Sequence, residues 1–180
     1  MEYKPFRVDV GFGSALANSF PDKGGGVGFI LNAEPKYAVI PQLSAGLKLE
    51  VGFLMREIKR IDDKGKETYD GGTTMQVNGS YLATFDYRFS QKSFRPFLGA
   101  GLGLYQFGTE KAIGSAKDDY PNYLGIVSRN NFGWMIRAGF DVTHLRGVIG
   151  YNFAGKDALN SNIGIFYLTI GAYFGGGRVK

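Results

Sequence analysis

The sequence predicts an all-β fold, an eight-stranded antiparallel up-and-down β-barrel that forms one domain over residues 1–180. Apolar and polar residues alternate with period two in eight segments, long and short connections alternate between these segments, and helical periodicity is nearly absent. With 44% hydrophobic and 15% aromatic residues, the chain is far too apolar to be disordered. The absence of Cys excludes a disulfide framework and thiolate chemistry.

Three segments show the alternation most clearly, namely Leu43–Met55, Met75–Phe89 and Phe132–Val142. In Met75–Phe89, every second residue from Met75 is apolar or Gly, whereas most residues between them are Gln, Asn, Ser, Thr, Asp or Arg. Because successive side chains of a strand point to opposite faces, each of these segments is predicted to be a strand with one apolar and one polar face.

Weaker alternation predicts five more strands, at Lys4–Gly13, Gly26–Glu34, Pro96–Phe107, Gly147–Phe153 and Ile163–Phe174. The connections predicted to be long or polar are Ser14–Gly25, Arg56–Thr74, Gly108–Asn131 and Ala154–Asn162. Those predicted to be short turns are Pro35–Gln42, Ser90–Arg95 and His144–Arg146. A meander with every other connection tight gathers its long loops at one end, and eight strands suffice to close a barrel without free edges.

The apolar face is predicted to point outward, into a membrane. It carries too many aromatic rings for the narrow interior of an eight-stranded barrel. The polar face is dominated by Gly, Ser, Asn, Gln and Thr and lacks the Lys and Glu expected on a soluble surface. The rings also gather toward strand ends, as interfacial girdles do in membrane barrels. A soluble lipocalin-like ligand-binding barrel and a two-sheet soluble sandwich remain as alternatives.

The whole pattern resembles the small eight-stranded outer-membrane proteins, the OmpX-like, opacity-protein-like and OmpA membrane-domain group. Thr169–Phe174 is similar to the C-terminal aromatic signal of such barrels. The resemblance implies a transmembrane β-barrel in the outer membrane of a Gram-negative cell. It implies contact with membrane lipid and lipopolysaccharide, and a role in membrane integrity, adhesion or binding of a surface partner protein. Met1–Pro5 holds no apolar signal core, so we expect the mature form of an exported protein, with its signal peptide removed.

The inward face is predicted to carry a closed polar network of four basic and five acidic side chains rather than a pore. These are Arg7, Asp9, Glu34, Lys48, Glu50, Asp86, Arg88, Arg137 and Asp141. Nearly balanced opposite charges in a narrow space of low dielectric should pair and exclude free ions. Gly11, Gly13, Gly52 and Gly101 are expected to line the other half of the lumen, so that any cavity opens toward the long loops.

A basic rim is predicted at the short-turn end, where most of the net charge of +5 gathers. Its members are Lys4, Lys36, Lys92, Arg95, Arg146, Arg178 and Lys180. Such a rim suits the headgroups of an anionic leaflet, although turns also tolerate Lys and Arg without any such role. The basic residues form no continuous face with interleaved aromatics, so nucleic acid is not an expected partner.

No catalytic residue, cofactor or metal site is predicted. The glycines of Gly99–Gly103 do not have the spacing of a nucleotide-binding motif, and we expect them to make room for Arg or Tyr side chains inside the barrel. A lipid-modifying enzyme of the outer membrane is a further alternative, but it would need a nucleophile and a base at the loop end. The single His144 falls in the shortest turn, at the opposite end.

The connection Gly108–Asn131 carries apolar and aromatic residues that are candidate surface-loop contacts, namely Tyr120, Tyr123, Leu124 and Ile126. The alternative is that they extend the two flanking strands beyond the membrane and pack on one another. We expect the barrel to be monomeric.

Overall fold

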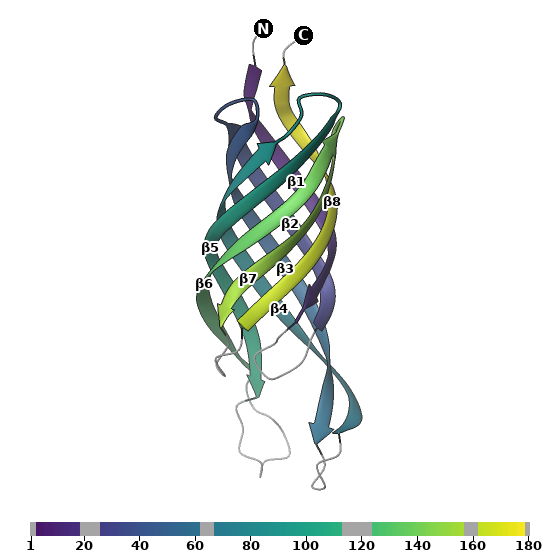
Figure 1. The fold of residues 1–180 in the computed structure, drawn as a ribbon. Helices are drawn as coiled ribbons and strands as arrows, with labels where there is room; N and C mark the ends of the chain where they lie inside the picture. The colour runs from purple at the N-terminus through teal and green to yellow at the C-terminus, as the bar shows by residue number, and fades with distance from the viewer. Residues whose placement is uncertain (1–2, 19–25, 62–66, 113–123, 157–161, 179–180) are drawn as a thin grey trace.

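The computed structural model describes residues 3–18, 26–61, 67–112, 124–156 and 162–178, and in them eight strands form one closed barrel (Figure 1). The strands are β1 (Tyr3–Ala17), β2 (Gly26–Ala38), β3 (Leu43–Ile61), β4 (Glu67–Arg88), β5 (Phe94–Ala112), β6 (Leu124–Val142), β7 (Leu145–Lys156) and β8 (Asn162–Arg178). Each strand pairs antiparallel with the next, and β8 pairs with β1 to close the sheet. The predicted barrel is therefore confirmed, and the two-sheet sandwich is wrong.

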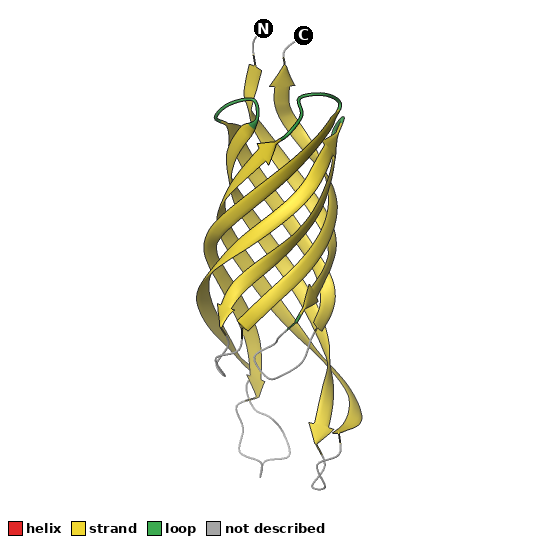
Figure 2. Cartoon of the chain, viewed as in Figure 1, coloured by secondary structure: helices red, strands yellow, loops and turns green. Residues whose placement is uncertain are grey.

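The short connections and both ends of the described chain lie at one end of the barrel (Figure 2). These connections are residues 39–42, 89–93 and 143–144. The strand ends at Ala17, Gly26, Ile61, Glu67, Ala112, Leu124, Lys156 and Asn162 lie at the opposite end, called the loop end below. Residues 39–42, 89–93 and 143–144 form short connections, as predicted. Two connections predicted to be long are shorter than expected, since only residues 62–66 separate β3 from β4 and only residues 157–161 separate β7 from β8. Among the described residues, no helix is long and apolar enough to cross a membrane.

The strands are longer than predicted, mostly at the loop end. The β3–β4 pairing continues through Lys59 with Tyr69 to Ile61 with Glu67, and the β5–β6 pairing reaches Ala112 with Leu124. Both extensions project beyond the rest of the barrel (Figure 1). The β3–β4 extension is mostly polar and lacks apolar alternation. Apolar alternation indicates a strand face that packs against an apolar phase, whereas a strand can pair without it.

The direction of the alternation agrees with the prediction. On β4, Tyr81, Phe85 and Tyr87 are exposed, while the intervening Thr84 and Asp86 are buried in the lumen. Exposed rings contact one another at two heights on the outer surface of the barrel. Phe94 stacks on Phe140 near the short turns, with ring centroids 5.8 Å apart, and Trp134 lies 5.5 Å from Phe153 nearer the loop end. Two aromatic levels on an apolar outer surface are typical of a barrel that spans a bilayer.

The loop-side half of the lumen, as far as the structure describes it, holds apolar side chains beside the predicted glycines. The filling residues include Ile30, Leu54, Tyr105, Met135 and Ile165, none more than 1% exposed. The space beside the glycines is also occupied. A Cβ added at Gly52 would lie 2.3 Å from Oδ1 of Asn78, and one at Gly101 would lie 3.2 Å from Met135.

Candidate functional site: the charged lumen

The structure places all nine residues of the predicted polar network in the lumen, none more than 5% exposed. They come from β1, β2, β3, β4 and β6, because the inward face of each of these strands carries charge at corresponding heights. β5 and β8 contribute aromatic side chains instead, among them Phe97 and Tyr167.

Two residues assigned to the basic rim belong to this network, and their assignment was wrong. Lys36 is 2% exposed and Arg146 is 4% exposed. The predicted turns were too long, since β2 runs on to Ala38 and β7 begins at Leu145, so both side chains lie on strands and face inward. Among the side chains that the structure describes, the lumen thus holds six basic and five acidic ones, Arg7, Lys36, Lys48, Arg88, Arg137 and Arg146 with Asp9, Glu34, Glu50, Asp86 and Asp141.

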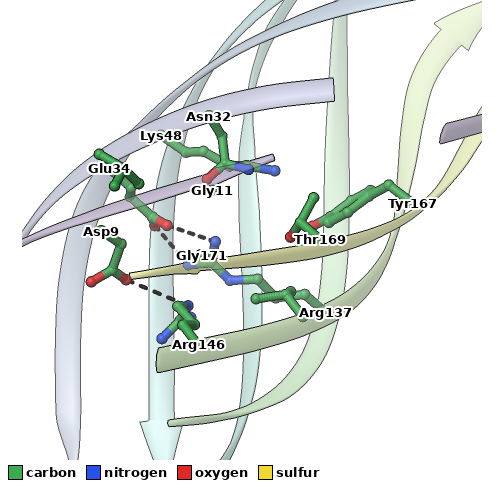
Figure 3. A pocket seen from close by; sticks show the side chains of 12 residues that line it. Asp9, Gly11, Asn32, Glu34, Lys48, Arg137, Arg146, Tyr167, Thr169 and Gly171 are labelled. Carbon is green, nitrogen blue, oxygen red and sulfur yellow. Dashed lines mark hydrogen bonds and ion pairs between the residues drawn. The ribbon is translucent and has the colours of Figure 1, made fainter. Parts of the chain in front are cut away.

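Arg137 on β6 connects strands on the other side of the lumen. Its Nη1 and Nη2 donate to the two carboxylate oxygens of Glu34 on β2 at 2.8 and 2.6 Å, and its Nε donates to Oδ1 of Asp86 on β4 at 2.8 Å. Figure 3 shows the Glu34 contact from the side of the adjacent cavity. Such a bidentate guanidinium–carboxylate pair fixes the geometry of both groups.

Lys36 and Arg146 supply the remaining positive charge around Asp9 and Asp86. The Nζ of Lys36 lies 2.7 Å from Oδ2 of Asp9, 2.5 Å from Oδ2 of Asp86 and 3.2 Å from Oε2 of Glu34. Nη2 of Arg146 donates to Oδ2 of Asp86 at 2.8 Å. Each of these two cations therefore touches carboxylates from more than one strand.

Asp141 is surrounded by three guanidinium groups. Arg7 lies 2.8 Å from its Oδ2, Arg146 lies 2.9 Å from its Oδ1, and Arg88 approaches Oδ2 at the longer distance of 3.4 Å. Arg7 also donates to Asp9 at 2.8 Å. Arg88 is therefore the most weakly paired cation of this group, which lies at the level nearest the short turns.

A smaller group lies beside the main network. Lys48 pairs with Glu50, and the side-chain amide of Asn152 donates to Oε1 of Glu50 at 2.8 Å. The Lys48 Nζ also lies 4.3 Å from the ring centre of Tyr167.

Aromatic rings pack against the arginines of the network, and the sequence analysis does not predict these contacts. The guanidinium of Arg146 lies 3.8 Å from the ring centre of Phe97, and that of Arg7 lies 4.6 Å from the ring centre of Tyr173. Both rings sit on strands whose alternation is weak, so their inward orientation could be read only from their parity relative to exposed neighbours such as Leu98 and Phe174.

One cavity of about 10 Å³ lies next to the network, lined by residues that include Asp9, Lys48, Arg137, Arg146 and Tyr167 (Figure 3). This volume is room for about one water molecule. Paired charges and a cavity of this size make the arrangement a packed polar core.

Two of the four candidate loop contacts lie in the part of the chain that the structure describes. Leu124 and Ile126 lie on β6, where their backbones pair with Ala112 and Glu110, so they extend a strand as the alternative interpretation had it. Tyr120 and Tyr123 lie outside the described residues.

His144 lies in the two-residue turn between β6 and β7, exposed, with its ring centre 5.8 Å from that of Tyr173. The described part of the chain contains no group of three or more His, Cys, Asp or Glu residues placed to hold a metal ion.

Comparison with known proteins agrees with the geometry. No protein-family model and no curated sequence matches the chain. Among solved structures, Neisserial surface protein A is similar with a TM-score of 0.66 at 17% identity, over 96% of this chain and 98% of that one. The attachment invasion locus protein Ail of Yersinia pestis gives a TM-score of 0.49 at 17% identity, over 97% and 100% of the two chains. The N-terminal β-barrel domain of Pseudomonas aeruginosa OprF gives a TM-score of 0.49 at 13% identity, over 96% and 100%. The chain has the fold of the small eight-stranded outer-membrane β-barrels.

Proposed function

We propose that this protein is an integral outer-membrane barrel with a structural or surface-interaction role, and that its lumen does not conduct ions. The observation that carries the proposal is the charged network that crosses the lumen from β2 and β4 to β6.

Two successive layers support a closed lumen. In the half nearest the short turns, carboxylates are paired with cations, so a permeating ion would have to break buried pairs. In the other half, Leu54, Tyr105, Met135 and neighbouring apolar side chains offer an ion no ligands.

The outer surface supports a membrane environment. Phe12, Phe29 and Phe132 are between 61% and 68% exposed, an arrangement that costs free energy in water and gains it against lipid. Membrane lipid and lipopolysaccharide are therefore the partners that this surface fits, with the barrel as a monomer in the outer membrane.

The projecting β3–β4 and β5–β6 hairpins support a role at the cell surface. They extend a rigid scaffold at the loop end, and connections on a rigid scaffold commonly carry binding residues. A surface protein is the partner class that these hairpins would suit, with Tyr120 and Tyr123 as candidate contacts. A catalytic role is not part of the proposal, because His144 lies at the opposite end.

The test is electrical. We expect the purified, refolded protein to give no steady conductance in planar bilayers. Stable single-channel currents that disappear when the same sample is heat-denatured would contradict the closed lumen and indicate transport of small solutes.

A further inference from the structure

The short-turn mouth of the lumen has more positive charge than its carboxylates neutralise. The lumen as described holds one more basic than acidic side chain. The surplus lies at this end, because the ion pair of Arg88 is a 3.4 Å contact with Asp141, a carboxylate that Arg7 and Arg146 already contact at 2.8 and 2.9 Å. A buried charge that is not compensated is costly, so this level of the barrel favours an additional anion.

A second cavity lies at this mouth. Its enclosed volume is about 10 Å³, and its lining includes Arg7, Lys36, Ser44, Arg88, Arg95 and Tyr173. Four of its lining side chains are cationic and none is a carboxylate. The volume is room for about one water-sized atom.

Three hydrogen-bond donors of this cavity have no partner in the part of the chain that the structure describes. They are Nε of Arg7, Oγ of Ser44 and Nε of Arg95. Arg7 is 5% exposed and Ser44 is 2% exposed, so neither group has free access to bulk water. Buried donors are rarely left unpaired, since each costs the free energy of its lost hydration.

The chemistry of these groups indicates an acceptor that carries negative charge. Guanidinium N–H groups donate and cannot accept, and a hydroxyl can also donate. Lys36 makes the electrostatic potential of the cavity more positive. Its Nζ does not point at a ligand there, because it contacts Asp9, Glu34 and Asp86. Arg95 is held at the entrance by a hydrogen bond to the Tyr173 hydroxyl.

We propose that this cavity binds a phosphate group, one oxygen of which enters the space between Arg7, Ser44 and Arg95. Arginine suits this ligand because its planar fork of donors matches the oxygens of a phosphate. The remaining oxygens lie at the mouth, where Arg88 and Arg95 lie. The group belongs either to free inorganic phosphate or to the headgroup of an anionic phospholipid of the adjacent leaflet. This site does not depend on the proposed surface role.

The first test is direct binding of inorganic phosphate to the folded barrel in octyl glucoside micelles, which contain no phosphate, followed by the ³¹P resonance. We expect a saturable change. Arg95→Gln should weaken binding about tenfold, the loss expected for a hydrogen bond to a charged group. The matched control is Lys92→Gln, which removes the same charge from an exposed position of the neighbouring turn and should change binding less than twofold.

Ser44→Ala separates ligand binding from folding. If the Ser44 hydroxyl binds the anion, this variant should weaken phosphate binding several-fold, although its unfolding midpoint without phosphate stays unchanged because no folded-state hydrogen bond is lost. Equal weakening by Lys92→Gln and Arg95→Gln would overturn the proposal in favour of diffuse attraction by the basic rim.

The source of the phosphate is tested by competition. If the ligand is a lipid headgroup, phosphatidylglycerol added to the micelles should displace inorganic phosphate from the wild-type protein. If the ligand is the free anion, inorganic phosphate should bind and phosphatidylglycerol should not displace it. Absence of saturable binding of both probes to the wild-type barrel would overturn the proposal.

Discussion

At the scale of single residues, Arg137 is a side chain that joins strands across the lumen. It binds Glu34 with two hydrogen bonds and Asp86 with a third, so one guanidinium links β2 and β4 to β6 across the interior. Buried ion pairs of this kind stabilise little relative to an apolar core, but removal of one partner leaves the others charged and uncompensated.

Arg137→Ala is therefore expected to lower the free energy of unfolding by about 3–5 kcal/mol, the cost of breaking a buried pair. Arg88→Ala should cost clearly less, because Arg88 approaches Asp141 only at 3.4 Å and two other arginines remain on that carboxylate. The measurement is urea unfolding in micelles. Equal losses in the two variants would show that the contacts of Arg137 do not carry the stability of the network.

The outward orientation makes a second prediction at this scale. Ile136 is 54% exposed and lies midway between the outward-facing Phe132 and Phe140 on β6. Ile136→Arg should destabilise the barrel by about 2–4 kcal/mol, the cost of a lipid-facing arginine at the midplane. Ser93→Arg, in the exposed turn between β4 and β5, is the control and should be nearly neutral in the same unfolding assay.

The alternation of apolar and polar residues in the sequence places nine charged side chains in the lumen, but it does not place Lys36 or Arg146 there. The sequence predicts a turn that begins at Pro35. In the structure it pairs with Val8 of β1, and the β2–β3 register is the same on both sides of it, from Ala33 with Leu49 to Lys36 with Gly46. A proline removes one ladder hydrogen bond without ending the strand.

Arg146 was missed for a related reason. The turn between β6 and β7 has only two residues, and Thr143 occupies the left-handed region at a φ of 54°. Turn positions with a positive φ usually carry Gly or Asn, so Thr143 gives no sequence signal for a two-residue turn. The short turn places Arg146 directly opposite Asp141, which completes the network.

At the scale of the elements, glycines of one strand make room for the side chains of others. Gly99 on β5 pairs with Asp86 on β4 and Arg137 on β6, and a Cβ there would lie 2.1 Å from Oδ1 of Asp86 and 3.0 Å from Nε of Arg137. The expectation that the Gly99–Gly103 run leaves space for an arginine is therefore confirmed at Gly99. At Gly103 a Cβ would instead meet the backbone oxygen of Tyr81, at 2.0 Å.

Gly99→Ala should displace Asp86 from its three cations and lower the free energy of unfolding by about 1–3 kcal/mol, the cost of overpacking a filled interior. The matched control is the adjacent residue on the outer face, where Ala100→Val adds apolar volume toward lipid and should be tolerated. Both variants are compared by urea unfolding in the same micelles. A Gly99→Ala variant as stable as Ala100→Val would mean that the lumen relaxes around the added methyl group.

At the scale of the whole molecule, closure by the β1–β8 pairing leaves no free sheet edge in the barrel wall. Hydrogen bonds of the backbone are made within the wall, and the side chains that face the lumen are bonded to one another across it. The charged network, the apolar layer and the lipid-facing surface thus belong to one cooperative unit, in which β1 and β8 cannot separate without opening the lumen.

This closure predicts that the folded protein migrates differently on a gel before and after boiling. Detergent at room temperature finds no edge strand to bind and cannot solvate the inward charges, so the unheated barrel should stay compact and run apart from the boiled, extended chain. Circular dichroism of the unheated sample should show β-structure. Arg137→Ala should lower the temperature at which the compact band is lost, whereas Ala100→Val should not. A single band at all temperatures, together with a helical spectrum, would contradict the architecture itself and not only the account of its lumen.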